Sequence, residues 1–316
     1  MFVFSCYCAV VLRTVPVDSS IFLVNTSSTH IFEHARRDCD DLQKLCCKEG
    51  TETRNLIFEI IWERKLHRYQ KLLQQRHALG KNKSIVTAKN AYDLYEPLWN
   101  CENEERFGGE FSYAIGDGPK WTCGLSALSN QSPRRAPCLV YSIGSHYDFS
   151  FEYAVHERLS HCEIHTFDGT LDLSIRDTPR DLYSRNIHFH NWNVISTYSA
   201  KNSNLTKEKT MRQIIRDLNH TGKTIQIVKI DCEGCEYAVL PELFESDVEV
   251  QQLMVELHGT QTDAIANIFN NMSHQHMLLF HKERNHYGCD GYRCVEFSFV
   301  SKEFAKAALL AYLLGE

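Results

Sequence analysis

The sequence predicts an α/β fold: a doubly wound, seven-stranded, mostly parallel sheet with an antiparallel terminal hairpin, preceded by a helical N-terminal extension. Two observations carry this prediction. From residue 138 onward, short β-rich runs alternate with segments that read as helices, which is typical of parallel strands joined by crossovers. The last two β-rich runs have no long helical segment between them, which indicates a terminal hairpin.

Length and charge limit the class of protein. The 316 residues exceed what a single core usually needs, so we expect one main domain with an appendage. The formal charge of -6, from 34 Lys and Arg against 40 Asp and Glu, gives no electrostatic footprint for nucleic acid. We therefore expect no nucleic-acid partner.

Cysteines and glycosylation signals point to an oxidising compartment. The chain has 13 cysteines, more than a reduced cytosolic chain of this size needs. It also has six Asn-x-Ser/Thr sequons, at Asn25, Asn82, Asn130, Asn204, Asn219 and Asn271. Together these features predict a glycoprotein of the secretory pathway, located in the ER or Golgi lumen and either membrane-associated or secreted.

The N-terminus begins with an apolar run, MFVFSCYCAVVL, which is too short to span a bilayer and is interrupted by Arg13. We interpret residues 1–24 as a signal segment or a weak membrane anchor, with a buried strand as the alternative. Apolar residues at steps of three and four over 54–79, followed by Gly80, predict one long helix. This places a helical stem at 25–89 and the main domain at 90–316.

Seven runs are the expected strands of the main domain. They lie at 138–144, 162–168, 187–195, 225–231, 252–258, 276–283 and 294–300. Helices are expected between them at 151–159, 207–218 and 263–272. In such a sheet, ligands bind at the carboxyl ends of the strands, so the residues that follow each strand are the candidates for chemistry.

The first strand runs into Ser142, Gly144, Ser145 and Asp148, just before the helix that starts near Phe151. A glycine at this turn lets the backbone approach a ligand, and the helix N-terminus offers free N–H groups. A simple strand-to-helix turn is the alternative. The second strand ends at Asp168, where an acid can accept both hydroxyl protons of a ribose; capping of its own turn is the alternative.

The fourth strand ends in KIDCEGCE at 229–236, which has three carboxylates within six residues. Because unpaired buried charge is costly, we expect these carboxylates to face a cleft or solvent. Alternation by two predicts that Asp231 and Glu233 point into one crevice, while Gly234 permits the turn into a helix. A carboxylate there could act as a general base or position a hydroxyl group.

The fifth strand ends in VELH at 255–258, with Glu256 and His258 on one face by the same alternation. Histidine titrates near neutrality, so His258 is a candidate proton acceptor; a structural histidine is the alternative.

Three cysteine pairs need an interpretation. Cys101 and Cys123 could close a glycine-rich loop with a disulfide. Cys232 and Cys235 form a C-x-x-C. It is a zinc site if Cys289 and Cys294 supply the second ligand pair; the alternatives are a redox-active pair, a disulfide or a coincidence of spacing. The irregular spacing disfavours zinc, and we assign no metal ligands.

Several segments together resemble a known family: GDGPKWTC at 116–123, CLVYSIGSHYDFSFE at 138–152, IHTFD at 164–168, KIDCEGCE and VELH. They are similar to the methyltransferase-like protein 24 group, itself similar to FkbM-type methyltransferases. The resemblance covers roughly residues 90 to 300. It implies a Rossmann-like class I methyltransferase fold and S-adenosylmethionine as the cofactor.

Carried over by position, the resemblance implies that Ser142, Gly144 and Ser145 border the methionine part of the cofactor and that Asp168 holds the ribose. Asp231 would lie beside the reactive methyl group, and Glu256 and His258 would close the far side. The chain departs from the usual pattern at Ser142, where many methyltransferases have an acid, and at Ser145 and His146, where glycines are common.

We therefore expect methyl transfer from S-adenosylmethionine to an oxygen of a sugar or small secreted metabolite. Asp231, Glu233 and His258 are the candidate catalytic residues, and Ser142, Gly144, Ser145, Asp148, Asp168 and Asp231 are the candidate cofactor ligands. The alternative is a non-catalytic luminal binding or scaffold protein that retains the fold.

Overall fold

The computed structural model describes residues 51–109, 118–129, 138–174, 177–200, 207–287 and 289–314. The chain divides into two compact units, residues 1–64 and 65–316. Helix α3 (Thr51–Gly80) confirms the predicted long helix and runs through the division. The predicted signal or anchor at 1–24 lies outside the described residues. Among the described helices, none is long and apolar enough to cross a membrane.

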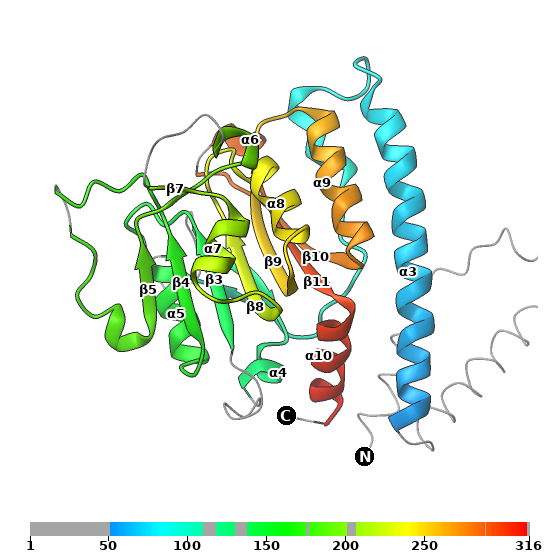
Figure 1. Ribbon diagram of the computed structural model, residues 1–316. Helices are drawn as coiled ribbons and strands as arrows, with labels where there is room; N and C mark the ends of the chain where they lie inside the picture. Colours follow the sequence, from blue (N-terminus) through cyan, green and yellow to red (C-terminus); the bar gives the residue numbers. More distant parts are fainter. Residues whose placement is uncertain are drawn as a thin grey trace, which may run out of the picture. The chain divides into compact units, whose positions relative to one another are not determined.

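A seven-stranded sheet forms the centre of the unit 65–316 (Figure 1). Its strand order is β10-β11-β9-β8-β3-β4-β5. Strand β11 runs antiparallel to both of its neighbours, and the other adjacent pairs are parallel. This confirms the predicted sheet and its terminal hairpin. The strands are β3 (Leu139–Ile143), β4 (Glu163–Phe167), β5 (Ile187–His190), β8 (Lys223–Ile230), β9 (Val248–His258), β10 (Met277–Arg284) and β11 (Cys294–Ser301).

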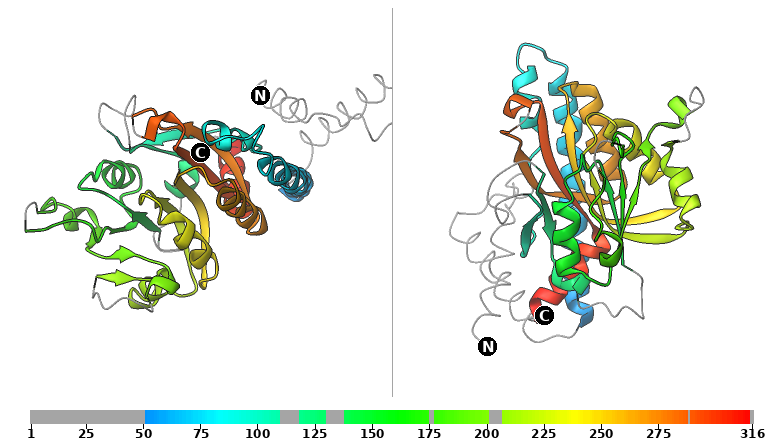
Figure 2. Two further views of the ribbon diagram at one scale, coloured as in Figure 1. Left: turned by 90° about the horizontal axis from the view of Figure 1, so that it is seen from above. Right: turned by 90° about the vertical axis from the view of Figure 1, so that its left-hand side faces the viewer.

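Helices cover both faces of the sheet (Figure 2). Helix α5 (Ser150–Arg158) lies on one face, and α7 (Met211–Asp217) and α8 (Glu236–Phe244) lie on the other. Every side chain of β3 is buried, as expected of a parallel strand covered on both sides. Helix α9 (Thr262–His274) precedes β10, and α10 (Lys302–Leu314), which the pattern did not predict, follows β11.

The predicted strand at 187–195 is two strands. Strand β5 ends at His190, whose carbonyl oxygen accepts a hydrogen bond from Trp192 N at 2.7 Å, and the chain turns there. Beyond the turn, β6 (Asn193–Val194) pairs with β7 (Glu208–Lys209) in a separate parallel pair. Helix α7 starts later than predicted because Thr210 caps it, accepting from Gln213 N at 3.2 Å.

Short elements precede the main sheet. Strands β1 (Glu104–Phe107) and β2 (Lys120–Cys123) form an antiparallel pair, followed by α4 (Leu125–Ser129). The predicted Cys101–Cys123 disulfide is present at this pair. A second disulfide, Cys138–Cys162, joins the residues that immediately precede β3 and β4. The remaining short elements are α6 (Thr197–Ala200) and the 3-10 turns η1 (Ala88–Leu94), η2 (Tyr183–Arg185) and η3 (Cys289–Gly291).

Candidate active site

A cavity of about 450 Å³ lies at the carboxyl ends of β3, β4 and β8. This is where a doubly wound sheet binds its ligands, and the volume is within the range of roughly 300–1,000 Å³ typical of small-molecule sites. Six of the predicted site residues line it: Gly144, Ser145, Asp148, Asp168, Asp231 and Glu233. The structure thus brings together three turns that are far apart in the sequence.

Gly144 makes the close packing of two of these turns possible. Its φ of +82° lies in the left-handed region that favours glycine. A Cβ atom at this position would lie 1.7 Å from the backbone oxygen of Asp231. The turns after β3 and β8 therefore meet backbone to backbone, and only a residue without a side chain fits.

The predicted cofactor role of Ser142 needs correction. Ser142 is completely buried within β3 and is not among the residues that line the cavity. Its hydroxyl group faces the buried Glu152 of α5. Burial raises the pKa of Glu152, and the Lys229 ammonium and nearby hydroxyl groups oppose that rise. Ser142 belongs to the core behind the cavity. Successive side chains of a strand point to opposite faces of the sheet, and that of Ser142 points toward α5.

Asp168 lies on the cavity wall, yet it mostly serves its own turn. One carboxylate oxygen accepts from the backbone nitrogens of Ser145 and His146 at 3.0 and 2.8 Å. The other accepts from the nitrogen and hydroxyl group of Thr170 at 2.9 and 2.6 Å. Hydrogen bonds hold its pKa below the usual value although burial opposes this. A ribose would have to replace the Thr170 hydroxyl group, so the ribose role stays a prediction.

Asp148 supports the start of α5. Its Oδ1 accepts a hydrogen bond from Ser150 N at 2.8 Å. This bond satisfies one of the free N–H groups at the helix start. Asp148 also faces the cavity, so it remains a candidate cofactor ligand.

The side chain of Lys120 lies buried between two carboxylates. Its Nζ lies 2.9 Å from Asp231 Oδ2 and 2.5 Å from Glu296 Oε1, and the side chain is 1% exposed. Burial alone would lower the pKa of Lys120, but Asp231, Glu296 and Glu256 raise it. Likewise, burial would raise the pKa of Asp231, but Lys120 and Lys229 hold it below its usual value. Lys120 and Asp231 are therefore both charged.

Two acids beside this pair titrate near neutrality. Burial, together with Glu296 and Asp231, raises the pKa of Glu256 to about 8. Burial raises the pKa of Glu296 to about 7, although Lys120 opposes the rise. These two residues are directly opposite each other on β9 and β11, which explains their mutual repulsion.

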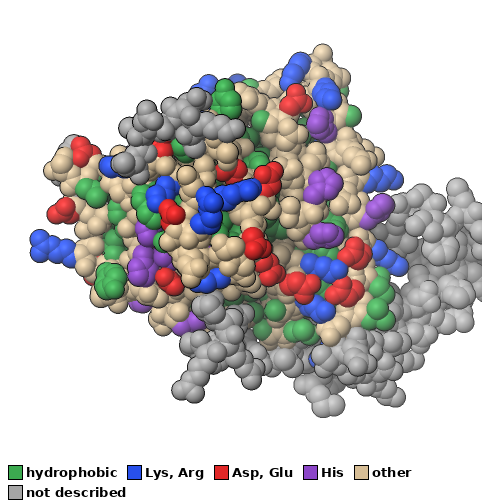
Figure 3. Space-filling view, in the orientation of Figure 1, with side chains coloured by type: hydrophobic (Ala, Val, Ile, Leu, Met, Phe, Trp, Pro, Cys, Tyr) green, Lys and Arg blue, Asp and Glu red, His purple; other side chains and the backbone are tan. Residues whose placement is uncertain are grey.

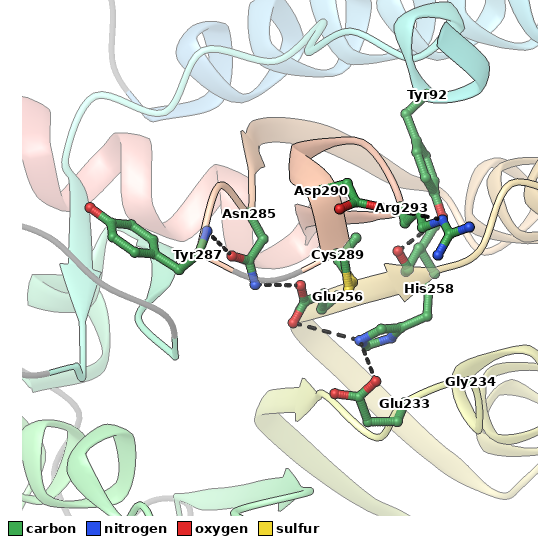
Figure 4. Close-up of a disulfide and its surroundings, with 12 residues drawn as sticks. Tyr92, Glu233, Gly234, Glu256, His258, Asn285, Tyr287, Cys289, Asp290 and Arg293 are labelled. Carbon is green, nitrogen blue, oxygen red and sulfur yellow. Dashed lines mark hydrogen bonds and ion pairs between the residues drawn. A yellow bond between two sulfur atoms is a disulfide. The ribbon is translucent and has the colours of Figure 1, made fainter. Parts of the chain in front are cut away.

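His258 is held in place by a buried carboxylate. Glu236 Oε1 accepts from His258 N at 2.7 Å and lies 3.2 Å from His258 Nδ1. The other ring nitrogen, Nε2, lies 3.5 Å from Glu233 Oε2 and 3.9 Å from Glu256 Oε2 (Figure 4). Burial would lower the pKa of His258, but Glu236, Glu256 and Glu233 raise it to about 9. The structure confirms that Glu256 and His258 share a face.

The three acids after β8 do not behave alike. Strand β8 ends at Ile230, so Asp231 and Glu233 lie in a turn where strand alternation does not apply. Glu233 has a φ of +55°, and its side chain is 86% exposed. Glu236 is completely buried, so the prediction that all three acids face a cleft or solvent was wrong for Glu236. Its charge is tolerated because it accepts N–H groups from Gly234 and His258.

The cysteine pairs are disulfides. Cys232 is bonded to Cys235 and Cys289 to Cys294. The hypothesis of a zinc site made of these four sulfur atoms is therefore wrong, and the disulfide alternative is confirmed. Cys232 and Cys235 both line the cavity, so this disulfide fixes the ends of the turn that bears Glu233.

Sequence reasoning missed four residues of the site, one of which is Glu296, the partner of Lys120 on β11. Lys120 comes from β2, outside the main sheet, and only its position within GDGPKWTC hinted at a role. Lys229 faces the cavity from β8 and donates a hydrogen bond to the Gly144 carbonyl oxygen. Trp192 lines the cavity just beyond β5, within the segment predicted as uninterrupted strand.

Comparison with protein families identifies the class of protein. A family model described as "Methyltransferase domain" matches residues 54–301. The chain belongs to this methyltransferase family. A search of curated proteins finds no match for this methyltransferase.

Solved structures of methyltransferases are among the similar folds. Precorrin-6y C5,15-methyltransferase from Geobacter metallireducens has 11% identity and a TM-score of 0.35, covering 56% of this chain and 86% of its own. Fibrillarin from Methanococcus jannaschii has 11% identity and a TM-score of 0.35, covering 69% and 86%. An O-methyltransferase family protein from Burkholderia thailandensis has 10% identity and a TM-score of 0.31, covering 56% and 55%.

Proposed function

We propose that this chain transfers a methyl group from S-adenosylmethionine to a hydroxyl group of a sugar or small metabolite. The observation that carries the proposal is the His258–Glu236 pair beside the cavity. Because Nδ1 of His258 is bonded to a buried carboxylate, Nε2 is the nitrogen left to act as a general base, and it lies 3.5 Å from Oε2 of Glu233, which lines the cavity. The pair lies at the strand ends next to Asp231 and Glu233, which line the cavity.

The residues of the cavity fit the proposed cofactor. Gly144 leaves backbone exposed at the cavity wall, and Phe151, Phe167 and Trp192 supply apolar surface for a flat ring. Lys229, which is 6% exposed, offers a cation for a carboxylate, and Asp231 offers an anion for an ammonium group. When bound, S-adenosylmethionine supplies an electrophilic methyl group on a sulfonium.

In the proposed reaction, the acceptor oxygen bonds to the methyl carbon and the bond from that carbon to sulfur breaks, leaving its electron pair on sulfur. The acceptor proton passes to Nε2 of the neutral His258 imidazole, the form that predominates only above its pKa of about 9. Glu236 keeps the imidazole oriented, and Asp231, held by Lys120, keeps a fixed negative charge at the cavity wall. Positioning supplies much of the rate in such a displacement, so one proton acceptor suffices.

The test combines binding with turnover. Calorimetric titration with S-adenosylhomocysteine is expected to show binding by the wild type and by His258→Gln. A panel of glycans and small alcohols with labelled S-adenosylmethionine is expected to reveal turnover that His258→Gln lowers by about 10²–10⁴-fold. The matched control is His274→Gln, an exposed histidine of α9, which should keep both properties.

Absence of binding at millimolar S-adenosylhomocysteine would contradict the proposal and favour a scaffold that has kept the fold. Binding with full turnover in His258→Gln would show that the base is another group, of which Glu256 and Glu233 are nearest.

We also propose that the protein works in the secretory pathway. The four disulfides among the described cysteines and the exposed sequons at Asn82 and Asn219 support this. A mobility shift after glycosidase treatment of protein from secreting cells tests it, and an unshifted band would contradict it.

A further inference from the structure

Histidine side chains gather on one face of the sheet, away from the proposed methyl-transfer chemistry. Tyr141 of β3, His165 of β4 and His188 of β5 are in register, so their side chains project on the same face. Glu163, two residues before His165, shares this face, and His220 reaches it from the segment after α7. Figure 3 shows histidines grouped over β4 and β5.

Three of these side chains have the composition of a metal site. One ligand atom each of Glu163, His165 and His220 lies within 4.8 Å of the other two. His165 and His220 are 4% and 3% exposed, whereas the Glu163 side chain is 42% exposed. A donor set of two imidazoles and one carboxylate favours Zn²⁺ over Mg²⁺ and Ca²⁺, which take oxygen ligands.

The orientation of both imidazoles is set by partners behind them. His165 Nδ1 lies 2.9 Å from His190 Nε2, and His220 Nδ1 lies 2.7 Å from the Tyr141 hydroxyl group. With Nδ1 engaged, Nε2 is the atom that each ring has left for a ligand. Metal-binding histidines almost always have such a partner on the second nitrogen. His165 Nε2 already faces Glu163 Oε1 at 3.0 Å.

We propose that Glu163, His165 and His220 bind a zinc ion that ties β4 to the segment after α7. A fourth ligand is water or His188, whose Nε2 lies 4.0 Å from Glu163 Oε1. Zinc bonds of about 2.0–2.2 Å require the ligand atoms to close in, and the half-exposed Glu163 side chain has room to rotate. The proposed ligands lie up to 57 residues apart in the sequence, so no short sequence motif contains all three.

None of the three proposed zinc ligands lines the cavity of the proposed methyl transfer. Glu163 begins β4, whereas the cavity lies at the carboxyl ends of the strands. Zinc content is therefore measured separately from binding of S-adenosylhomocysteine, so failure of one proposal is distinguishable from failure of the other.

The test uses the full chain, produced without a histidine tag, stripped with a chelator under non-reducing conditions and dialysed against zinc chloride. Elemental analysis is expected to find close to one zinc per chain. His165→Gln and His220→Gln are expected to lose it, and Tyr141→Phe, which removes only the partner of His220, should weaken affinity about 10–100-fold. Cobalt substitution should give a tetrahedral visible spectrum without a thiolate charge-transfer band.

His258→Gln is the matched control, because Asp231, Glu256 and His258 form another group of potential ligands. This variant should keep its zinc. Less than one fifth of an equivalent in the wild type, loss of zinc in His258→Gln alone, or unchanged affinity in Tyr141→Phe would each overturn the proposal. The wild-type and Tyr141→Phe results decide the matter even if the histidine variants fail to fold.

Discussion

Replacement of Lys120 by methionine is expected to lower the free energy of unfolding by about 3–5 kcal/mol near pH 7.5, the usual cost of removing one partner of a buried ion pair. Lys120 Nζ contacts Asp231 at 2.9 Å and Glu296 at 2.5 Å. At an effective dielectric constant of about 20, each contact is worth roughly 6 kcal/mol of attraction. Most of this attraction only offsets the free-energy cost of removing the three charged groups from water. Methionine fills much of the same volume, so the loss measures the stranded carboxylates.

The loss of stability in Lys120→Met should become smaller as the pH falls. In the wild type, the lowered pKa of Asp231 stabilises the fold above the usual value of 3.8, and that contribution is lost as the pH falls through the lowered pKa. Without Lys120, burial raises the pKa of Asp231 and Glu296, and a raised carboxyl pKa destabilises the fold until the group is protonated. As the pH falls, the difference in free energy of unfolding between the wild type and Lys120→Met should therefore narrow. The narrowing is up to about 1.4 kcal/mol per pH unit for each of the two carboxyl groups.

The assay is urea unfolding followed by tryptophan fluorescence, with disulfides intact, at about pH 7.5 and about pH 5.5. The double variant Lys120→Met/Glu296→Gln removes one stranded charge and should recover at least about 1 kcal/mol. A loss below about 1 kcal/mol near pH 7.5, or a gap that does not change with pH, would refute the reasoning.

Three further predictions test the site and its support. Gly144→Ala places a methyl group on the Asp231 carbonyl oxygen, so this variant should lose the binding of S-adenosylhomocysteine seen by calorimetry. The control is Gly234→Ala, whose added methyl group meets no atom within 4 Å, and it should bind at least tenfold better than Gly144→Ala. The value of kcat/KM should rise with pH, with the midpoint of the rise at about pH 9, where His258 loses its proton. Glu236→Gln should move this midpoint to lower pH, and a midpoint that does not move would assign the titration to another group. Replacing Cys138 and Cys162 by serine opens a loop with a sequence separation of 24 and should cost about 3.5 kcal/mol in urea unfolding, whereas no loss would show that the bond does not constrain the unfolded chain.

The fold could be predicted because its signals are local. Strands β3 and β8 read as apolar runs since helices cover both faces, and the absence of a helix-length segment between β10 and β11 gave the hairpin. The break after β5 was missed because His190, Trp192 and Val194 continue an alternating pattern that the turn at Trp192 overrides. Hydrophobic periodicity does not register a turn made by one backbone hydrogen bond.

The site was predictable only where it follows strand ends. Gly144, Asp168 and Asp231 were found because parallel strands bring their carboxyl ends to one edge. Lys120 and Glu296 were missed because their pairing depends on β2 lying beside the main sheet, a contact between distant segments that no spacing encodes. Glu236 was misjudged because charge alone suggested exposure, whereas three N–H groups of the chain satisfy it.

The buried carboxylate of Glu236 has a mechanical consequence. It bonds the first residue of α8 to both the backbone and the ring of His258, so the position of the imidazole depends on the position of that helix. The side chains of α8 that pack on the sheet, Val239, Leu240 and Leu243, are completely or almost completely buried. Substitutions of these side chains are therefore expected to displace the imidazole and slow proton transfer, although none of the three residues lines the cavity.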